Sequence, residues 1–206
     1  MKFILGTKQN MTEYFTEEGV VVPVTIITAG PVKVTSVKGS EKDGYSAVQV
    51  GFGEQKEHRI NKPVKGQMKG DLFRVLKEFR LKTGDKFEGA VGDMIDVGAF
   101  SAGDKLQVSA ISKGKGFQGV VKRHGFHGGP RSHGQKHSER EPGSISGGLR
   151  THVPKGMRMA GRMGSDRITY KNLKVVYVDK ENNTMLIKGA VPGKRGTLVE
   201  IISRSN

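Results

Sequence analysis

A 53-residue stretch, Ser112 to Gly164, constrains the fold of this chain more than any other part of the sequence. It holds 13 of the 30 glycines and five of the six histidines. It contains eleven Lys and Arg residues but only two acidic residues, Glu139 and Glu141. This basic segment therefore carries +9 of the formal net charge of +15. Its larger apolar residues are few, and burying them would not offset an ordering cost of about 1–2 kcal/mol per residue. We therefore expect a long loop that a partner orders, and not a domain of its own.

The sequence on both sides of the basic segment is typical of β protein. Val48, Val50 and Phe52 recur at every second position, which predicts one buried face of a strand. Short apolar runs end at Gly, Pro or Asn turns, a pattern typical of an antiparallel barrel or sandwich. The expected strands lie in GVVVPVTIITAG, PVKVTSV, GYSAVQVGFG, DKLQVSAIS, LKVVYVD, TMLIKG and TLVEIIS.

One stretch between the expected strands has a different period. In GDLFRVLKEFRL, residues 70–81, the apolar side chains of Leu72, Val75, Leu76 and Phe79 follow helical spacing. We predict a short amphipathic helix that packs its apolar face on the β structure.

Composition limits the kinds of partner and site. A surplus of 35 Lys+Arg over 20 Asp+Glu attracts polyanions. Cysteine is absent, which excludes disulfides and thiolate metal sites. The apolar run at the N-terminus stops after Leu5, and no run approaches the ~20 apolar residues of a membrane span. We therefore expect a soluble, cytosolic protein with no membrane partner.

The basic segment opens with the pattern G-x-G-x-x-G at Gly114, Gly116 and Gly119, which raises the alternative of a nucleotide-dependent enzyme. The dinucleotide fingerprint needs a helix that begins at the glycines. VVKRHGFHGGP follows here, and its glycines and proline predict no helix. The downstream motifs of a protein kinase are absent from the sequence. The context therefore disfavours a nucleotide-binding fold. Binding of ATP by the purified chain would favour the nucleotide-dependent enzyme instead.

The histidines form two spaced pairs, His124 with His127 and His133 with His137, that could bind zinc on a helix or tight turn. The glycine-rich backbone would not hold them in place, and their neighbours are cations. Serines that adjoin histidines here lack the rigid scaffold that catalysis needs. We expect no metal, no cofactor, no small-molecule substrate and no catalytic residue.

RNA accounts for each component of the basic segment. Lys and Arg neutralise phosphates, Arg and aromatic rings stack on bases, and histidines add stacking and hydrogen bonds. Glycines let the backbone approach phosphates closely. A membrane anchor would need an amphipathic helix, which the segment lacks. The predicted RNA-binding residues are Lys113, Lys115, Phe117, Lys122, Arg123, His124, His127, Arg131, His133, Lys136, His137, Arg140, Arg150, His152, Lys155, Arg158, Arg162 and Arg167, and the predicted sites of close backbone approach are Gly114, Gly116, Gly119, Gly128, Gly129, Gly147 and Gly148.

Several stretches resemble the universal large-subunit ribosomal protein L-three family in its short bacterial or organellar form. SKGKGFQGVVKRHGF, residues 112–126, resembles the family pattern S-x-G-K-G-x-x-G-x-x-x-R. GGPRSHG, PGSI, MAGRMGSDRIT and IKGAVPG follow in the family's order, and GTKQNMTEYFTEEGVVVPVTII resembles its opening strands. The resemblance covers essentially the whole chain.

The resemblance implies a fold and a role. It implies a mainly β protein with a translation-protein-like antiparallel barrel over residues 1–111 and 165–206, a small, partly helical insertion over 56–90, and a long basic loop over 112–164. The loop would thread through large-subunit ribosomal RNA toward the peptidyl transferase centre. The barrel would bind near the 3′ end of that RNA, support subunit assembly and contact neighbouring ribosomal proteins. No enzymatic activity is implied. A free RNA chaperone with the same chemistry remains the alternative.

Overall fold

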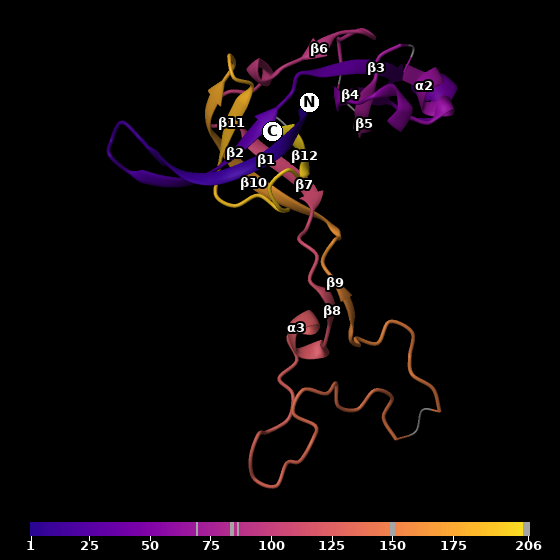
Figure 1. The fold of residues 1–206 in the computed structure, drawn as a ribbon, viewed down its shortest axis with the longest axis vertical. Helices are drawn as coiled ribbons and strands as arrows, with labels where there is room; N and C mark the ends of the chain where they lie inside the picture. The colour runs from indigo at the N-terminus through magenta and orange to yellow at the C-terminus, as the bar shows by residue number, and fades with distance from the viewer. Residues whose placement is uncertain (69, 83–84, 86, 149–150, 204–206) are drawn as a thin grey trace. The chain divides into compact units, whose positions relative to one another are not determined.

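The computed structural model describes residues 1–206 apart from 69, 83–84, 86, 149–150 and 204–206 (Figure 1). The chain forms two compact units. The first combines residues 1–111 with 167–206, and the second contains residues 112–166. Among the described residues, no helix has the length and apolar character needed to cross a membrane.

The first unit contains a closed antiparallel barrel, which confirms the predicted mainly β class. Six strands follow one another around it in the order β1, β12, β7, β10, β11, β2. Every hydrogen-bonded pair in this cycle is antiparallel, so each barrel strand has a partner on both sides. The barrel strands are β1 (Lys2–Phe15), β2 (Val21–Ala29), β7 (Lys105–Ile111), β10 (Arg167–Asp179), β11 (Thr184–Lys188) and β12 (Leu198–Ser203).

The barrel interior is filled by aliphatic side chains from these strands. Ile4 and Ile201 are partners in the register of β1 with β12, and both are fully buried. Ile27, Leu106 and Ile187 are buried to the same degree from β2, β7 and β11. The isoleucines among them are β-branched, and such side chains favour the extended backbone and pack well on a pleated surface. The apolar runs of β2, β7, β10, β11 and β12 therefore supply the barrel core, whereas PVKVTSV and GYSAVQVGFG form strands of a second sheet.

A second sheet in the same unit is inserted between β2 and β7. Its strands lie in the order β5 (Phe73–Arg80), β4 (Ala47–Glu54), β3 (Val32–Lys38), β6 (Met94–Ile95). Val34, Val48 and Val50 from this sheet belong to the same apolar core as the barrel. The helices beside these strands are short: α1 (Ser40–Asp43), η1 (Glu57–Arg59), α2 (Lys62–Met68) and η2 (Val97–Ala99).

The helix predicted over residues 70–81 is wrong, because residues 73–80 form strand β5. β5 pairs with β4, with Val48 opposite Phe79 and Phe52 opposite Val75. Phe79 is buried, and its ring stacks on that of Phe3 with centroids 4.6 Å apart. The open edge of β4 supplies backbone partners, and the aromatic and β-branched residues of this stretch suit a strand as well as a helix. The helical part of the insertion lies instead in η1 and α2.

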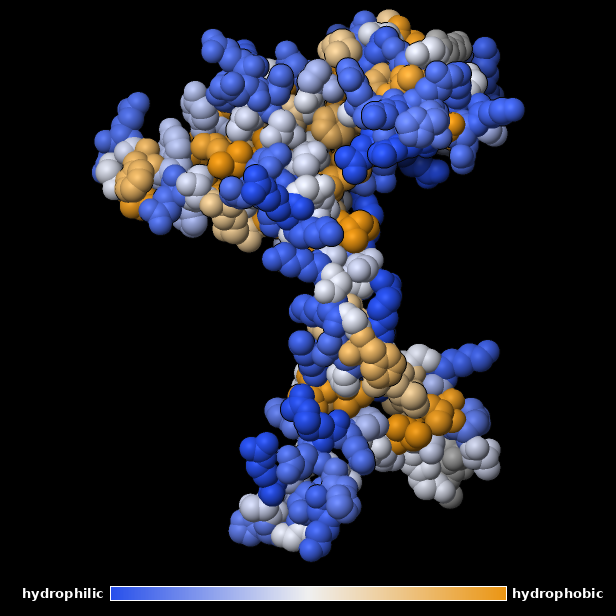
Figure 2. All heavy atoms as spheres, in the orientation of Figure 1, coloured by the Kyte–Doolittle hydropathy of each residue, from blue (hydrophilic) through white to orange (hydrophobic). Residues whose placement is uncertain are grey.

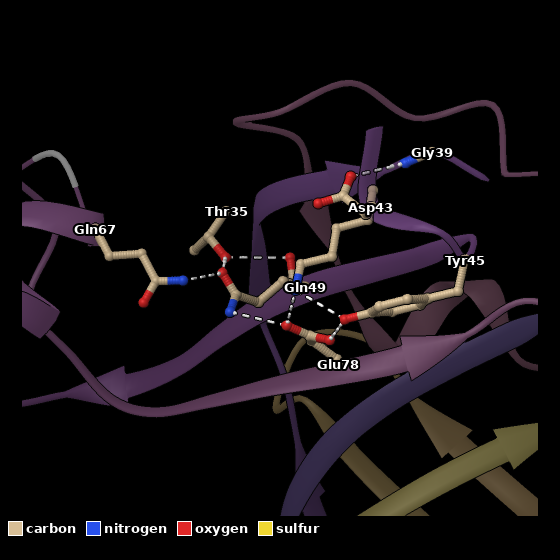
Figure 3. A network of polar contacts seen from close by, with 8 residues as sticks. Thr35, Gly39, Asp43, Tyr45, Gln49, Gln67 and Glu78 are labelled. Atoms are coloured by element: carbon tan, nitrogen blue, oxygen red, sulfur yellow. Dashed lines mark hydrogen bonds and ion pairs between the residues drawn. The ribbon is translucent and has the colours of Figure 1, made fainter. Parts of the chain in front are cut away.

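A polar network crosses the second sheet and ties its strands together (Figure 3). Gln49 is buried, and its side-chain amide oxygen accepts hydrogen bonds from Thr35 at 3.0 Å and from Gln67 at 3.3 Å. The Glu78 carboxylate accepts hydrogen bonds from Lys38 at 2.6 Å and from the Tyr45 hydroxyl at 2.9 Å. The hydrogen bond from Lys38 is the main reason that the pKa of Glu78 lies below its ordinary value. These contacts join side chains of β3, β4, β5 and α2.

Candidate nucleic-acid interface

The second unit begins and ends in a two-stranded stem. Strand β8 (Gly116–Gln118) pairs antiparallel with β9 (Gly161–Met163). Outside this pair, the amide of Lys115 donates to the carbonyl of Met163 and the amide of Ser112 donates to the carbonyl of Asp166, both at 2.9 Å. The two chain segments run so close together that a Cβ on Gly164 would lie 2.2 Å from the carbonyl oxygen of Lys113. The ends of the segment are thus held together by its own backbone.

A short helix, α3 (Val120–His124), follows the stem, although the sequence predicted no helix there. Gly119 is its N-cap, and the helix ends at Gly125, whose φ of 74° is left-handed. Val120 is buried and anchors the helix. A helix of five residues fits between the glycines, because the first four amides of any helix have no intrahelical carbonyl to pair with. The only sheet among the described residues of 112–166 is the antiparallel β8–β9 pair, so the parallel sheet of a dinucleotide fold is missing there.

Some of the predicted RNA-binding side chains hold the second unit together. Arg123 donates to the carbonyl of Met159 at 2.7 Å, and a ring nitrogen of His124 lies 3.1 Å from the same oxygen. The Arg158 guanidinium lies over the ring of Phe126 at 5.3 Å. Arg162 pairs with Asp166 at 2.9 Å, and Arg131 pairs with Glu139 at 3.3 Å. These cations have internal partners, and those that remain exposed can also contact an external anion.

Other predicted residues are exposed and have no partner among the described residues. The positive side chains of this group carry uncompensated charge on the surface, which suits contact with phosphates. Phe117 is 76% exposed and lies opposite Arg162 in the β8–β9 register, where its ring is free to stack on a base. The exposed, unpaired cations are Lys113, Lys115, Lys122, Lys136, Arg140 and Lys155, and the exposed histidines are His127, His133, His137 and His152.

A cleft of about 700 Å³ lies inside the second unit. Its wall includes His124, Phe126, His127 and Arg158, and the backbone of Gly128 and Gly129. Aromatic and guanidinium faces suit an unpaired nucleotide, because bases stack on such faces. The Gly129 amide donates to the carbonyl of Glu139 at 2.9 Å, so it is engaged within the unit. The sequence predicted each of these residues except Phe126 as an RNA-binding or close-approach residue, but it did not predict the cleft that they share.

The predicted glycines differ in what the surrounding chain requires. At Gly114, Gly128 and Gly129, an added Cβ would lie within 3 Å of the unit's own atoms. Gly116 and Gly147 have open space but a left-handed φ. Gly119 and Gly148 have open space and an ordinary φ. Gly119 and Gly148 are therefore the two predicted glycines that neither backbone conformation nor packing within the chain requires.

Two predicted RNA-binding residues are not among the described residues of the second unit. Arg167 belongs to β10 of the first unit, where it forms an ion pair with Glu200. Glu200 also pairs with Lys77 at 2.7 Å. Arg150 lies outside the described residues.

Sequence reasoning missed the backbone groups that organise the segment. The carbonyl of Met159 receives both Arg123 and His124. Gly161 lies against Arg123, since a Cβ there would be 2.7 Å from Nη1 of Arg123. The glycines of GRMG could have indicated such close packing. Every residue has a backbone carbonyl, however, so the sequence does not show which one accepts these hydrogen bonds. In the described part of the chain, no three His, Cys, Asp or Glu side chains gather as a metal site would require.

Comparisons with known proteins give one consistent family. A family model described as ribosomal protein L3 matches residues 74–185. The large ribosomal subunit protein uL3 of Herpetosiphon aurantiacus is 51% identical over 205 residues, which cover 98% of this chain and 95% of the relative. The proteins of the same name from Carboxydothermus hydrogenoformans and Synechococcus sp. RCC307 are each 48% identical, and the matches cover 97% and 96% of this chain and 96% and 93% of the relatives.

Proposed function

The chain belongs to the ribosomal protein L3 family, and on this premise we propose that it is a structural component of the large ribosomal subunit and binds its RNA. The curated relatives are named as large-subunit proteins, and the family is one of structural proteins, not enzymes. Residues 112–164 act as the RNA-binding loop, and residues 1–111 with 165–206 form the barrel domain that carries it.

One observation supports this role most strongly. Six cations of the second unit, Lys113, Lys115, Lys122, Lys136, Arg140 and Lys155, are exposed and have no acidic partner in the described chain. Other cations of the same unit form internal contacts, such as the hydrogen bond from Arg123 to the carbonyl of Met159. A loop that is fixed internally by one set of cations and leaves another set unpaired is suited to a polyanion.

We further propose a path for the loop, based on the family resemblance. The loop threads between helices of large-subunit ribosomal RNA toward the peptidyl transferase centre. The barrel binds near the 3′ end of that RNA and supports subunit assembly beside other ribosomal proteins. Glycine at Gly119 and Gly148, which the chain itself does not require, fits close passage along RNA.

The salt dependence of RNA binding tests the role of the unpaired cations. We compare the full chain with a variant carrying Lys115→Gln, Lys122→Gln and Lys136→Gln, using a transcript of the 3′ region of large-subunit RNA between about 50 and 200 mM salt. On a single-strand scale of ~0.7 per phosphate, the log–log slope falls by roughly 2.

A variant with the same net charge provides the control. Lys42→Gln, Lys56→Gln and Lys62→Gln remove three exposed lysines of the first unit. An equal fall of the slope in both variants would mean that net charge alone governs binding, as in an RNA chaperone. Release from every RNA alike at moderate salt would favour that chaperone. Retention in large subunits through a high-salt wash supports the structural role.

A further inference from the structure

The β1–β2 hairpin carries an acidic surface on a strongly basic chain. Residues 9–32 contain no Lys, Arg or His, although the formal net charge of the chain is +15. Glu13, Glu17 and Glu18 are exposed there and have no ion-pair partner in the described part of the chain. Three uncompensated carboxylates repel phosphate groups, so this surface is unsuited to RNA.

The same hairpin exposes apolar side chains near its end. Met11, Phe15, Val20 and Val21 are 51%, 64%, 54% and 49% exposed. The β1–β2 register places Phe15 opposite Val21, and the alternation along β1 brings Met11 to the face of Phe15. Figure 2 shows apolar residues among hydrophilic ones where this hairpin extends from the barrel. Exposed apolar groups that cluster beside charges mark an interaction surface.

The protein itself covers only the opposite face of the hairpin. Tyr14, on that face, stacks on Tyr177 with ring centroids 6.2 Å apart. The turn is fixed by Thr16, whose amide donates to the carbonyl of Val20 at 3.0 Å and whose hydroxyl accepts from the amide of Val20 at 3.1 Å. The exposed apolar face is therefore held on an ordered hairpin.

One edge of the hairpin is also open. β1 pairs with β12 only from Lys2 to Thr7 and with β2 as far as Phe15. Along residues 9–15, the edge of β1 that faces away from β2 has no strand partner among the described residues. An open edge offers backbone groups to an added extended segment.

We propose that the hairpin end, residues 11–21, docks a basic, extended segment of another protein of the large subunit. The segment adds to the open edge of β1, and its Lys and Arg side chains meet Glu13, Glu17 and Glu18. One of its apolar side chains packs on the face of Met11 and Phe15. Opposite charge and apolar contact together select this occupant over RNA and over a second copy of this chain, whose surface there is equally acidic. The proposal rests on the proposed function, since it assumes that the chain lies in the large subunit.

Photo-cross-linking from the hairpin tests the occupant. The full chain with Phe15→p-benzoylphenylalanine is expressed in cells, and purified large subunits are irradiated. We expect a cross-link to a peptide of a second protein that carries an excess of Lys and Arg. The product survives ribonuclease and is removed by protease. Adding Glu13→Lys, Glu17→Lys and Glu18→Lys lowers its yield at least about ten-fold.

A charge-matched control separates local from overall charge. Glu41→Lys, Glu54→Lys and Glu181→Lys change three exposed acids elsewhere in the first unit and leave the yield unchanged. A cross-link to RNA, to a second copy, or to a neutral or acidic peptide overturns the docking proposal. So does the absence of any cross-link from subunits that contain the chain. Absence of the chain from the subunits would remove the proposed function as well.

Discussion

Arg123 donates a hydrogen bond of 2.7 Å to the carbonyl oxygen of Met159, a residue 36 positions further along the chain. This contact joins helix α3 to the returning half of the second unit. Arg123 also packs closely on Gly161, where an added Cβ would lie 2.7 Å from Nη1 of Arg123. Its neighbour Lys122 is exposed and has no acidic partner in the described chain. Lys122 and Arg123 are neighbours in the sequence but differ in role. Arg123 makes an internal contact, and Lys122 is open to RNA.

Arg123→Gln and Lys122→Gln should separate these tasks. A hydrogen bond from a charged donor contributes ~1.5–3 kcal/mol, so Arg123→Gln should speed hydrogen exchange of the Lys115 and Gly125 amides by about ten- to a hundred-fold. Lys122→Gln should leave that exchange unchanged and lower the RNA salt slope by ~0.7. Exchange measured by mass spectrometry on the free chain, beside the salt titration, checks both. Similar exchange in the two variants would show that the contact with Met159 does not order the segment.

The barrel strands could be predicted from the sequence because they carry their own evidence, whereas their closure into a barrel and not a sandwich was implied only by the family resemblance. β2 is a run of β-branched residues that ends at Gly30, and β11 and β12 lie on either side of glycine-containing turns. Each of these strands buries apolar side chains that no helix period explains. The sequence did not predict that β1 continues to Phe15. The second half of this strand is largely exposed and mixes polar with apolar residues, so it lacks a clear pattern.

Strand β5 could not be predicted, because its residues satisfy two periods. Val75, Leu76 and Phe79 fit a helical stripe, while Val75 and Phe79 also share one face of a strand. The open edge of β4 decides between them, and that edge is a tertiary feature. The internal partners of the loop cations were hidden for a similar reason. Arg123 binds a backbone carbonyl far along the chain, which no residue type announces.

Phe79→Ala should destabilise the first unit far more than Leu76→Ala. Phe79 is buried and stacked on Phe3, and loss of such a ring costs about 3–5 kcal/mol. Leu76 is only half-buried and lies outside the core, so its loss costs less. Denaturant unfolding followed by circular dichroism gives both free energies. Equal losses would agree better with the helical stripe, in which the two side chains are equivalent.

Glu200 should make stability depend on pH. Burial by itself would raise the pKa of Glu200, but hydrogen bonds from Arg167 and Lys77 outweigh burial and hold the pKa below its ordinary value. A lowered pKa in the folded state contributes stability above the unfolded pKa of ~4.3, and this contribution is lost as pH falls through the folded value. Glu200→Gln should therefore lower the free energy of unfolding by about 1–2 kcal/mol at neutral pH.

The difference between Glu200→Gln and the parent should shrink as pH falls below the unfolded pKa of ~4.3 and through the lowered pKa of the folded state, where the parent's carboxylate becomes protonated. Thermal unfolding from acid to neutral pH measures it. Glu181→Gln, which changes an exposed acid, should follow the parent throughout. A difference that stays constant down to acid pH would mean that the ionised form of Glu200 is not what stabilises the barrel.

Gly128 and Gly148 should both be needed for entry into the subunit, but for different reasons. Gly128 has a φ of 77°, and a Cβ there would lie 2.1 Å from the carbonyl oxygen of Glu139. Gly128→Ala should therefore disturb the second unit of the free chain, which hydrogen exchange reports. Gly148 has an ordinary φ and open space around its missing Cβ, so Gly148→Val should leave the free chain unchanged. It should nevertheless reduce incorporation, because a branched side chain holds the backbone away from phosphate.

Sedimentation of large subunits from cells that express each variant measures incorporation. Gly39→Val is the matched control, since Gly39 also has open space and an ordinary φ but lies in the first unit. We expect Gly39→Val to enter subunits at the parental level and Gly148→Val to be largely excluded from them. If Gly148→Val sediments with mature subunits as fully as Gly39→Val, RNA does not approach the backbone closely at Gly148. The loop would then bind RNA through its side chains alone, chiefly through the exposed, unpaired cations.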